Sequence, residues 1–132
     1  MVAKAKKKKP PPGRNSTCFQ LPWPVSTNSW LRCIAGRAIK TKKWRLWLKA
    51  AKEAIQEAYT DLPLECSDIA VHVHLEPPTN RRFDIDNFGG KPILDALQGE
   101  GGVFLDDDQV DMLTIVRGEK HPGGRALVLV TW

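Results

Sequence analysis

Apolar and polar residues alternate most regularly over residues 69–76, where one face is wholly aliphatic: Ile69, Val71, Val73 and Leu75. A period of two residues is typical of a strand with one buried face. Residues 17–21 alternate in a similar way and are followed by Pro22-Trp23-Pro24. Proline lacks the N–H group that a strand ladder needs. We therefore expect strands over residues 17–21 and 69–76.

A helical period runs from about Thr41 to Thr60, where the apolar residues form one stripe: Trp44, Trp47, Leu48, Ala51, Ile55, Ala58 and Tyr59. Recurrence at three- and four-residue steps is typical of an amphipathic helix, and Thr41 suits its N-cap. A shorter helix is expected over residues 92–98, because Pro92 suits a first helical position and Gly99 the position past the end.

The remaining segments are less regular. Residues 25–40 carry no clear period and are expected to form a long loop. The last third predicts an antiparallel hairpin, with strands over 110–116 and 126–131 and a turn through 120–124. The element order β-α-β-α-β-β predicts an α+β fold: a single domain with a mixed sheet and helices packed on it.

Charge is divided unevenly along the chain. Residues 1–52 contain fourteen Lys or Arg and no acid, whereas residues 53–132 contain six bases and all fifteen acids. The two parts therefore carry +14 and −9, which indicates contact with a polyanion and favours a nucleic-acid backbone. Residues 1–15, a lysine run with prolines, are expected to form a disordered basic arm, either a solubilising tail or an attractor of nucleic acid; residues 16–132 form the domain.

Composition excludes several classes of protein. Three scattered cysteines do not form a disulfide framework or a zinc site, and no apolar run approaches a membrane span. We expect a cytoplasmic protein that has no membrane contact and no small-molecule cofactor. At 132 residues the domain is near the size at which a second copy often completes the core, so a dimer is plausible.

Two acidic segments carry the candidate chemistry. In extended backbone, Asp84 and Asp86 would point the same way, and residues 106–108 supply a third carboxylate about twenty residues later. Carboxylate oxygens with substrate phosphate are typical Mg²⁺ ligands, and Mn²⁺ is expected to substitute. A calcium loop is disfavoured, because its glycine and its bidentate glutamate are missing. A turn or capping role for the aspartates is the other alternative.

Lys91 begins the second predicted helix, where a cation opposes the helix dipole. This placement suggests that Lys91 neutralises a bound phosphate, with Asp95 four residues later orienting its ammonium group or reaching the metal.

Polar and basic residues near these segments are the expected DNA contacts: Asn28, Arg32, Arg37, Lys42, Lys43, Arg81 and Arg82. Trp30 could stack on a base or lie under its own loop, and Lys42 and Lys43 could simply be solvated. His72, His74 and Glu76 share a strand face, which is more typical of a polar sheet face than of a transition-metal site.

The chain resembles RusA-type Holliday junction resolvases of bacteria and their phages from about Phe19 onward. The resemblance rests on these motifs: Leu21-Pro22-Trp23-Pro24 with Ser26 and Asn28, Asp84-Ile85-Asp86-Asn87, Lys91-Pro92-Ile93-Leu94-Asp95-Ala96-Leu97 and Asp106-Asp107-Asp108-Gln109-Val110. It implies a homodimeric, Mg²⁺-dependent endodeoxyribonuclease that resolves four-way DNA junctions by paired symmetric nicks in recombination and repair. Such a protein would act in the cytoplasm, associated with the nucleoid.

Residue by residue, the resemblance implies that Asp84, Asp86 and Asp107 are catalytic metal ligands and that Lys91 is the essential lysine. The family usually places this lysine four residues after the second aspartate, whereas here Gly89-Gly90 makes the spacing five. We expect a glycine-rich bulge to absorb the extra residue. The alternatives are a non-cleaving module that binds branched nucleic acid and a related nuclease that acts on forks or flaps.

Overall fold

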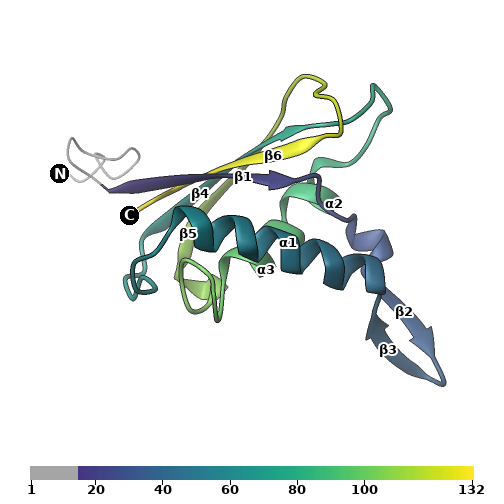
Figure 1. Ribbon diagram of the computed structural model, residues 1–132, viewed down its shortest axis with the longest axis horizontal. Coiled ribbons are helices and arrows are strands. Elements are labelled where there is room, and N and C mark those ends of the chain that lie inside the picture. Colours follow the sequence, from purple (N-terminus) through teal and green to yellow (C-terminus); the bar gives the residue numbers. More distant parts are fainter. Residues whose placement is uncertain (1–14) are drawn as a thin grey trace.

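Helices pack on one face of a four-stranded sheet in the computed structural model, which describes residues 15–132 (Figure 1). The strand order is β1-β6-β4-β5; β1 and β4 are antiparallel to β6, and β5 is parallel to β4. The strand bounds are β1 Ser16–Pro22, β4 Ile69–Glu76, β5 Val110–Arg117 and β6 Arg125–Thr131. The sheet is mixed, and the α+β prediction is confirmed.

The predicted hairpin in the last third is wrong, because β4 lies between β5 and β6. Which strands lie next to each other depends on how much of each strand the whole sheet buries, and the sequence pattern of a single strand does not show this. The helix-facing side chains of β4 and β6 are fully covered, whereas on the same face β5 leaves Leu113 37% exposed. This lower burial agrees with the position of β5 at the edge of the sheet.

Helix α1 (Lys42–Ala58) covers the sheet beside β1 and confirms the predicted amphipathic helix. Its buried stripe consists of Trp44, Trp47, Ala51 and Ile55. The Thr41 hydroxyl caps the helix by accepting the backbone N–H of Trp44 at 3.2 Å. The Trp47 indole donates to the Pro22 carbonyl at 3.0 Å, which ties α1 to the end of β1.

Two short helices, α2 (Ile85–Gly89) and α3 (Lys91–Leu97), lie in the connection from β4 to β5. The expected helix over 92–98 is thus confirmed one residue earlier. Lys52 of α1 donates to the carbonyls of Ala96 (3.1 Å) and Gln98 (2.7 Å) at the end of α3. Burial lowers the pKa of Lys52, and the charge of Asp95 raises it. Lys52 therefore joins two helices instead of serving a solvated basic face.

The expected long loop over 25–40 is wrong. It contains a 3₁₀ turn, η2 (Thr27–Ser29), and an antiparallel hairpin of β2 (Leu31–Ile34) and β3 (Arg37–Lys40), which projects from the body in Figure 1. All residues of both strands are exposed. The hairpin lacks the alternation that identified the other strands because neither of its faces is buried.

The second face of the main sheet remains exposed at Met112 (40%), Val116 (47%) and Leu129 (39%). A groove of about 510 Å³ crosses it between β1, β6, β4 and β5. His74 lies 3.5 Å from Glu76 on β4.

No helix within residues 15–132 is long and apolar enough to cross a bilayer.

The predicted basic arm lies outside the described residues except at Asn15. The backbone of Asn15 exchanges two hydrogen bonds with Trp132, at 3.1 and 3.0 Å, and so extends the β1–β6 ladder.

Glu76 should contribute stability that depends on pH. The hydrogen bond from Arg125 Nε (2.5 Å) lowers the pKa of Glu76, so its contribution is present above the ordinary pKa of 4.5 and is lost as the pH falls through the lower, folded-state pKa. We expect Glu76→Gln to unfold at lower urea concentration than the native protein at pH 7, with the difference shrinking below pH 4.5. Glu53→Gln, in an exposed pair with Lys49, is the control and should show little difference at either pH. A Glu76→Gln difference independent of pH would contradict the assignment.

Candidate active site

A cleft of about 590 Å³ lies where β4 ends, between the segment after β1 and the loop that leads to α2. Its lining combines three arginines and one carboxylate with polar and aromatic groups: Trp23, Ser26, Asn28, Pro77, Pro78, Thr79, Arg81, Arg82, Phe83, Asp84, Asn87, Phe88 and Arg117. The fold therefore brings the predicted DNA contacts Asn28, Arg81 and Arg82 together with the predicted ligand Asp84.

Three aromatic rings support the cleft. Trp23 lies 5.4 Å from Phe83 and 5.0 Å from Phe88, and the two phenylalanine rings are 5.4 Å apart, centroid to centroid. The two contacts of Phe83 are edge-to-face and that of Trp23 with Phe88 is tilted, and aromatic contacts of this kind stabilise a cluster beyond the area it buries. Trp23 follows β1, whereas Phe83 precedes α2 and Phe88 belongs to it, so the cluster fixes the two walls relative to each other.

Arg117 is a site residue that the sequence analysis missed. It ends β5, its guanidinium donates to the Phe83 carbonyl at 2.8 Å, and its central carbon lies 4.3 Å from the Phe83 ring centroid. The expected hairpin with residues 126–131 concealed this position. Only the parallel pairing with β4, in which Arg117 lies opposite Leu75, brings Arg117 to the cleft.

Asp84 and Asp86 are exposed at the start of α2, but the expected extended geometry is wrong. Asp84 is the extended N-cap residue and Asp86 already lies in the first helical turn. The Asp84 carbonyl accepts the backbone N–H of Asn87 at 3.2 Å, which starts the helical turn. The Asp84 carboxylate makes no side-chain capping bond to α2. Nearby, the Thr27 hydroxyl donates to the Asn87 side-chain oxygen at 2.9 Å, which links η2 to the same helix.

Gly89 and Gly90 lie before Lys91 at the junction between α2 and α3. A Cβ atom on Gly89 would lie 2.6 Å from Ile115 Cγ2 and 3.2 Å from Leu75 Cδ1, so glycine lets α2 lie directly on β4 and β5. Gly90 follows as the N-cap of α3, and its N–H donates to the Asp86 carbonyl at 3.2 Å. The register of α3 is therefore intact from Lys91 onward.

The Lys91 ammonium has two partners. It lies 3.1 Å from the Asp95 carboxylate one helical turn later and 5.7 Å from the centroid of the Trp30 ring. Trp30 in turn packs edge-on against the fully buried Trp44, at 5.1 Å. These contacts fix the position of a lysine whose side chain remains 45% exposed to a ligand.

The second acidic segment is a short turn, η3 (Asp107–Gln109), immediately before β5. Asp106 caps it, and the Gln109 amide donates to the carbonyls of Leu64 (2.8 Å) and Cys66 (2.7 Å). Desolvation raises the pKa of Asp107, the Asp106 carboxylate raises it further, and the nearby Lys91 ammonium lowers it. Lys91 thus lies within electrostatic reach of Asp107.

Oxygen donors and a lysine are the groups that suit Mg²⁺ and a phosphate. Desolvation is the largest cause of the raised pKa of Asp107, and the negative charges of Asp106 and Asp108 add to it. A bound cation would offset those charges, so these oxygen donors fit such an ion. Within residues 15–132, however, no three His, Cys, Asp or Glu side chains already form a group that could hold a metal. The predicted ligand set therefore stays a prediction.

The other predicted DNA contacts lie outside the cleft. Arg32 and Arg37 belong to the projecting hairpin, and Lys42 and Lys43 are exposed in the first turn of α1. Trp30, which was expected to stack on a base or lie under its own loop, is half-buried against Trp44.

An arginine-lined cleft with the exposed Asp84 carboxylate suits the class of proteins that act on a phosphate-bearing polymer. Residues 22–131 match the family described as Endodeoxyribonuclease RusA. The chain is also 32% identical over 117 residues to a crossover junction endodeoxyribonuclease rusA from Enterobacteria phage HK97, covering 89% of this chain and 95% of that protein. The chain belongs to the RusA family and is a nuclease that acts on DNA. These findings confirm the resemblance and the expectation of an enzyme.

Gly89→Ala should disturb the seat of α2. The added methyl group would overlap Ile115 and Leu75, and overpacking of this kind destabilises a domain by about 1–3 kcal/mol. Urea unfolding of Gly89→Ala, of Ile115→Ala and of the double variant measures the effect. Because Ile115→Ala removes the overlapping atom, the double variant should be less destabilised than the sum of the single variants. Strict additivity would show that Gly89 does not pack against Ile115.

Proposed function

We propose that this protein is a Mg²⁺-dependent nuclease that resolves four-way DNA junctions by paired symmetric nicks. The observation that carries the proposal is the cleft, in which Asp84 lies among Arg81, Arg82 and Arg117 in a chain of the RusA family. The phage relative is named for crossover junctions, and branched DNA is accordingly the proposed substrate. We place the protein beside DNA in the cytoplasm.

The arginines of the cleft would bind the phosphate backbone on either side of the scissile bond. This binding is independent of base sequence, because it depends on charge and on the release of counterions. Asn28 and Asn87, which both line the cleft, offer amide groups that would orient the backbone. The aromatic cluster beneath keeps these groups in place when the DNA is absent.

Asp84, Asp86 and Asp107 would hold Mg²⁺, and Mn²⁺ would substitute. When bound, the ion supplies Lewis acidity toward the phosphoryl group and makes water a better nucleophile at neutral pH. Lys91, held by Asp95 and Trp30, would neutralise the charge that develops on the non-bridging phosphate oxygens. Cleavage of the bond to the 3′ oxygen would leave a 5′ phosphate.

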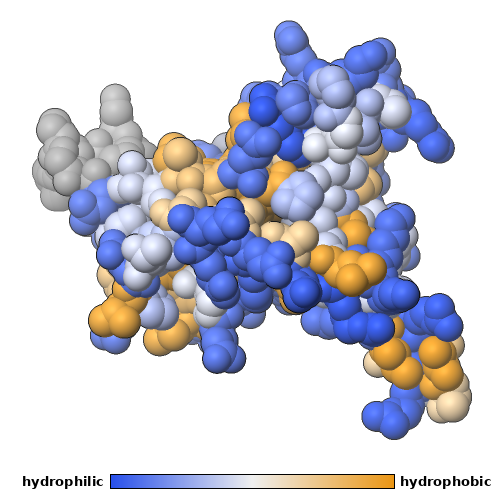
Figure 2. All heavy atoms as spheres, viewed as in Figure 1, coloured by the Kyte–Doolittle hydropathy of each residue, from blue (hydrophilic) through white to orange (hydrophobic). Residues whose placement is uncertain are grey.

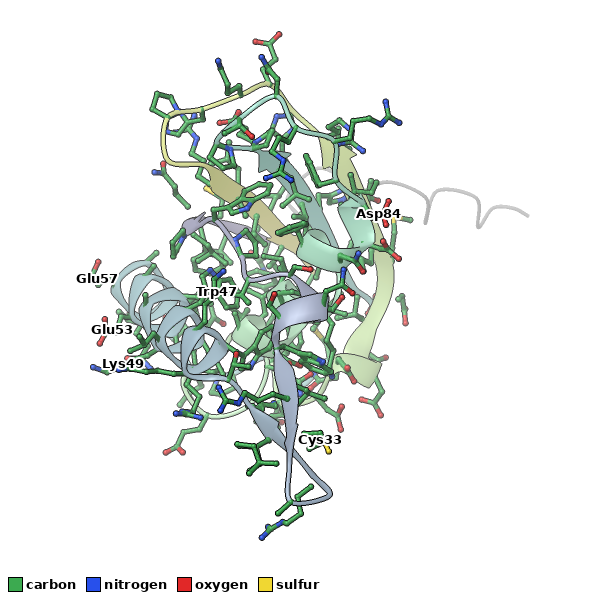
Figure 3. The ribbon with its side chains drawn as sticks, turned by 90° about the vertical axis from the view of Figure 1, so that its right-hand side faces the viewer. Cys33, Trp47, Lys49, Glu53, Glu57 and Asp84 are labelled. Carbon is green, nitrogen blue, oxygen red and sulfur yellow. The ribbon has the colours of Figure 1, made fainter. Side chains whose placement is uncertain are left out.

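Asp84→Asn and Asp107→Asn should each reduce junction cleavage by about 100-fold or more, because each removes an anionic ligand for the metal. Binding of the junction should be retained, since the arginines remain. The assay is nicking of an end-labelled four-way junction with Mg²⁺, with Mn²⁺ or with chelator, beside binding in chelator. Glu57→Gln, on the side of the molecule away from Asp84 in Figure 3, is the control and should cut normally.

Undiminished cleavage by either aspartate variant would remove that residue from the ligand set. Matched forks and flaps, assayed in parallel, separate the related-nuclease alternative: faster cleavage of a fork or flap than of the junction would favour it. Tight junction binding without nicks under all metal conditions would favour the non-cleaving module.

We further propose that the enzyme is a homodimer, so that two active sites can make paired nicks. The exposed sheet face around Leu129, Val116 and Met112 supports this, because apolar groups on it would be covered by a second copy. Leu129→Lys should convert a dimer into a folded monomer in sedimentation velocity, whereas Leu62→Lys, at a residue 85% exposed elsewhere, should not. A native protein that sediments as a monomer at micromolar concentration, with and without junction DNA, would contradict the proposal.

A further inference from the structure

The β2–β3 hairpin is built as an arm with a defined root and a free end. At the root, Thr41 N–H donates to the Trp30 carbonyl (2.9 Å), the Thr41 hydroxyl donates to the Ser29 carbonyl (2.7 Å) and Arg45 donates to the Lys40 carbonyl (2.6 Å). Beyond the root all eight strand residues are exposed. Four-residue strands extend about 13 Å, so the arm reaches well past the body.

The two faces of the arm differ. Opposite residues in an antiparallel pair share a face, so Arg32, Ile34, Arg37 and Ile39 lie together; we call this set the arm face. The other face carries Lys40, whose ammonium lies 5.4 Å from the Trp30 ring and 5.7 Å from the Trp44 ring. The arm face therefore points away from that tryptophan pair, with Ile34 and Ile39 exposed at 43% and 39%.

A partner for the arm face must accept positive charge and cover apolar side chains at the same place. Figure 2 shows the arm as a projecting patch of hydrophobic and hydrophilic atoms side by side. No acid occurs between residues 1 and 52, and neither Arg32 nor Arg37 forms an ion pair within residues 15–132. Two arm faces would repel each other. DNA fits both demands, since its phosphates alternate with sugars and base edges, and isoleucine is among the side chains that insert into the minor groove.

The root connects the arm to the candidate active site. The Trp30 ring has the Lys40 ammonium at 5.4 Å and the Lys91 ammonium at 5.7 Å. An arm that starts at this ring is in place to hold DNA next to the cleft. Its reach of about 13 Å corresponds to about four base pairs of duplex.

We propose that the β2–β3 hairpin is a DNA-binding arm that grips the duplex next to the cleavage site, with Arg32 and Arg37 on phosphates and Ile34 and Ile39 in the groove between them. The proposal rests on the proposed function and adds to it a second contact surface outside the cleft. Lys40 and Trp30 set the direction of the arm without belonging to its DNA-contacting face.

The charge of the arm is tested by equilibrium binding of a four-way junction to Asp84→Asn protein in chelator, at several salt concentrations. Adding Arg32→Gln and Arg37→Gln should weaken binding about tenfold and lower the slope of log affinity against log salt by about 2. Arg37→Gln alone should lower the slope by about 1, whereas Lys49→Gln, which removes one charge from the far side of α1 in Figure 3, should leave it unchanged. Equal effects of Arg37→Gln and Lys49→Gln would overturn the proposal.

The apolar part is tested by Ile34→Thr with Ile39→Thr, which keeps the β-branched shape that suits a strand. Affinity should fall about threefold with the salt slope unchanged, because apolar contact releases no counterions. Leu62→Thr is the control and should bind normally. Unchanged junction affinity of the isoleucine variant would overturn the proposal. If that variant also lost binding to anionic phospholipid vesicles, the arm face would be assigned to a membrane surface instead of DNA.

A variant that is expected to bind the junction more tightly distinguishes the proposal from misfolding, because misfolding would only weaken binding. The turn of the arm is Ala35-Gly36, and Ala35 has φ +53°, a left-handed conformation that asparagine and glycine adopt more readily than alanine. Ala35→Asn should preorganise the arm and tighten junction binding about two- to threefold. Weaker or unchanged binding would count against the arm. Failure of the native protein to nick junctions would instead contradict the proposed function, while arm binding is still measured.

Discussion

The parallel pairing of β4 with β5 is the constraint on which the candidate site depends. Parallel neighbours cannot be joined by a tight turn, so the chain must cross over from the end of one strand to the start of the next. That connection contains α2, α3 and η3, and it carries all the candidate catalytic residues: Asp84, Asp86, Lys91 and Asp107. The crossover in turn lies close to the sheet because Gly89 lets α2 rest on Leu75 and Ile115. Strand pairing and one glycine thus position the chemistry.

The sequence predicted those helices and strands that bury one face, because such elements show a periodic pattern of apolar residues. Strand β4 and helix α1 were identified because one face of each is buried, as Val71 and Trp44 illustrate. The β2–β3 hairpin left no such trace, since both of its faces are exposed. The order of strands in the sheet was equally hidden, because a single strand does not record which neighbour covers its edge. Arg117 was missed for that reason alone.

The candidate site, too, was predicted only in part from the sequence. Motif spacing identified the aspartates and Lys91, and the ion pair between Lys91 and Asp95 follows from their one-turn separation on a helix. Sequence alone did not reveal that Trp30 from a distant segment would lie beside Lys91, nor that Asp84 would begin a helix. Both depend on tertiary packing, through Trp44 in the first case and through the Trp23, Phe83 and Phe88 cluster in the second.

The candidate site contains both arginines and carboxylates, which have opposite effects on a phosphate ligand. Arg81, Arg82 and Arg117 attract a phosphate to the cleft, whereas the Asp84 carboxylate in the same lining repels it. Near Lys91, burial raises the pKa of Asp107, and the carboxylates of Asp106 and Asp108 raise it further. A divalent cation is the simplest group that would relieve both conflicts, because it binds carboxylate and phosphate oxygens together. On this reasoning we propose that the arginines, with the projecting arm beyond them, bind the DNA and that the aspartates make cleavage depend on a metal.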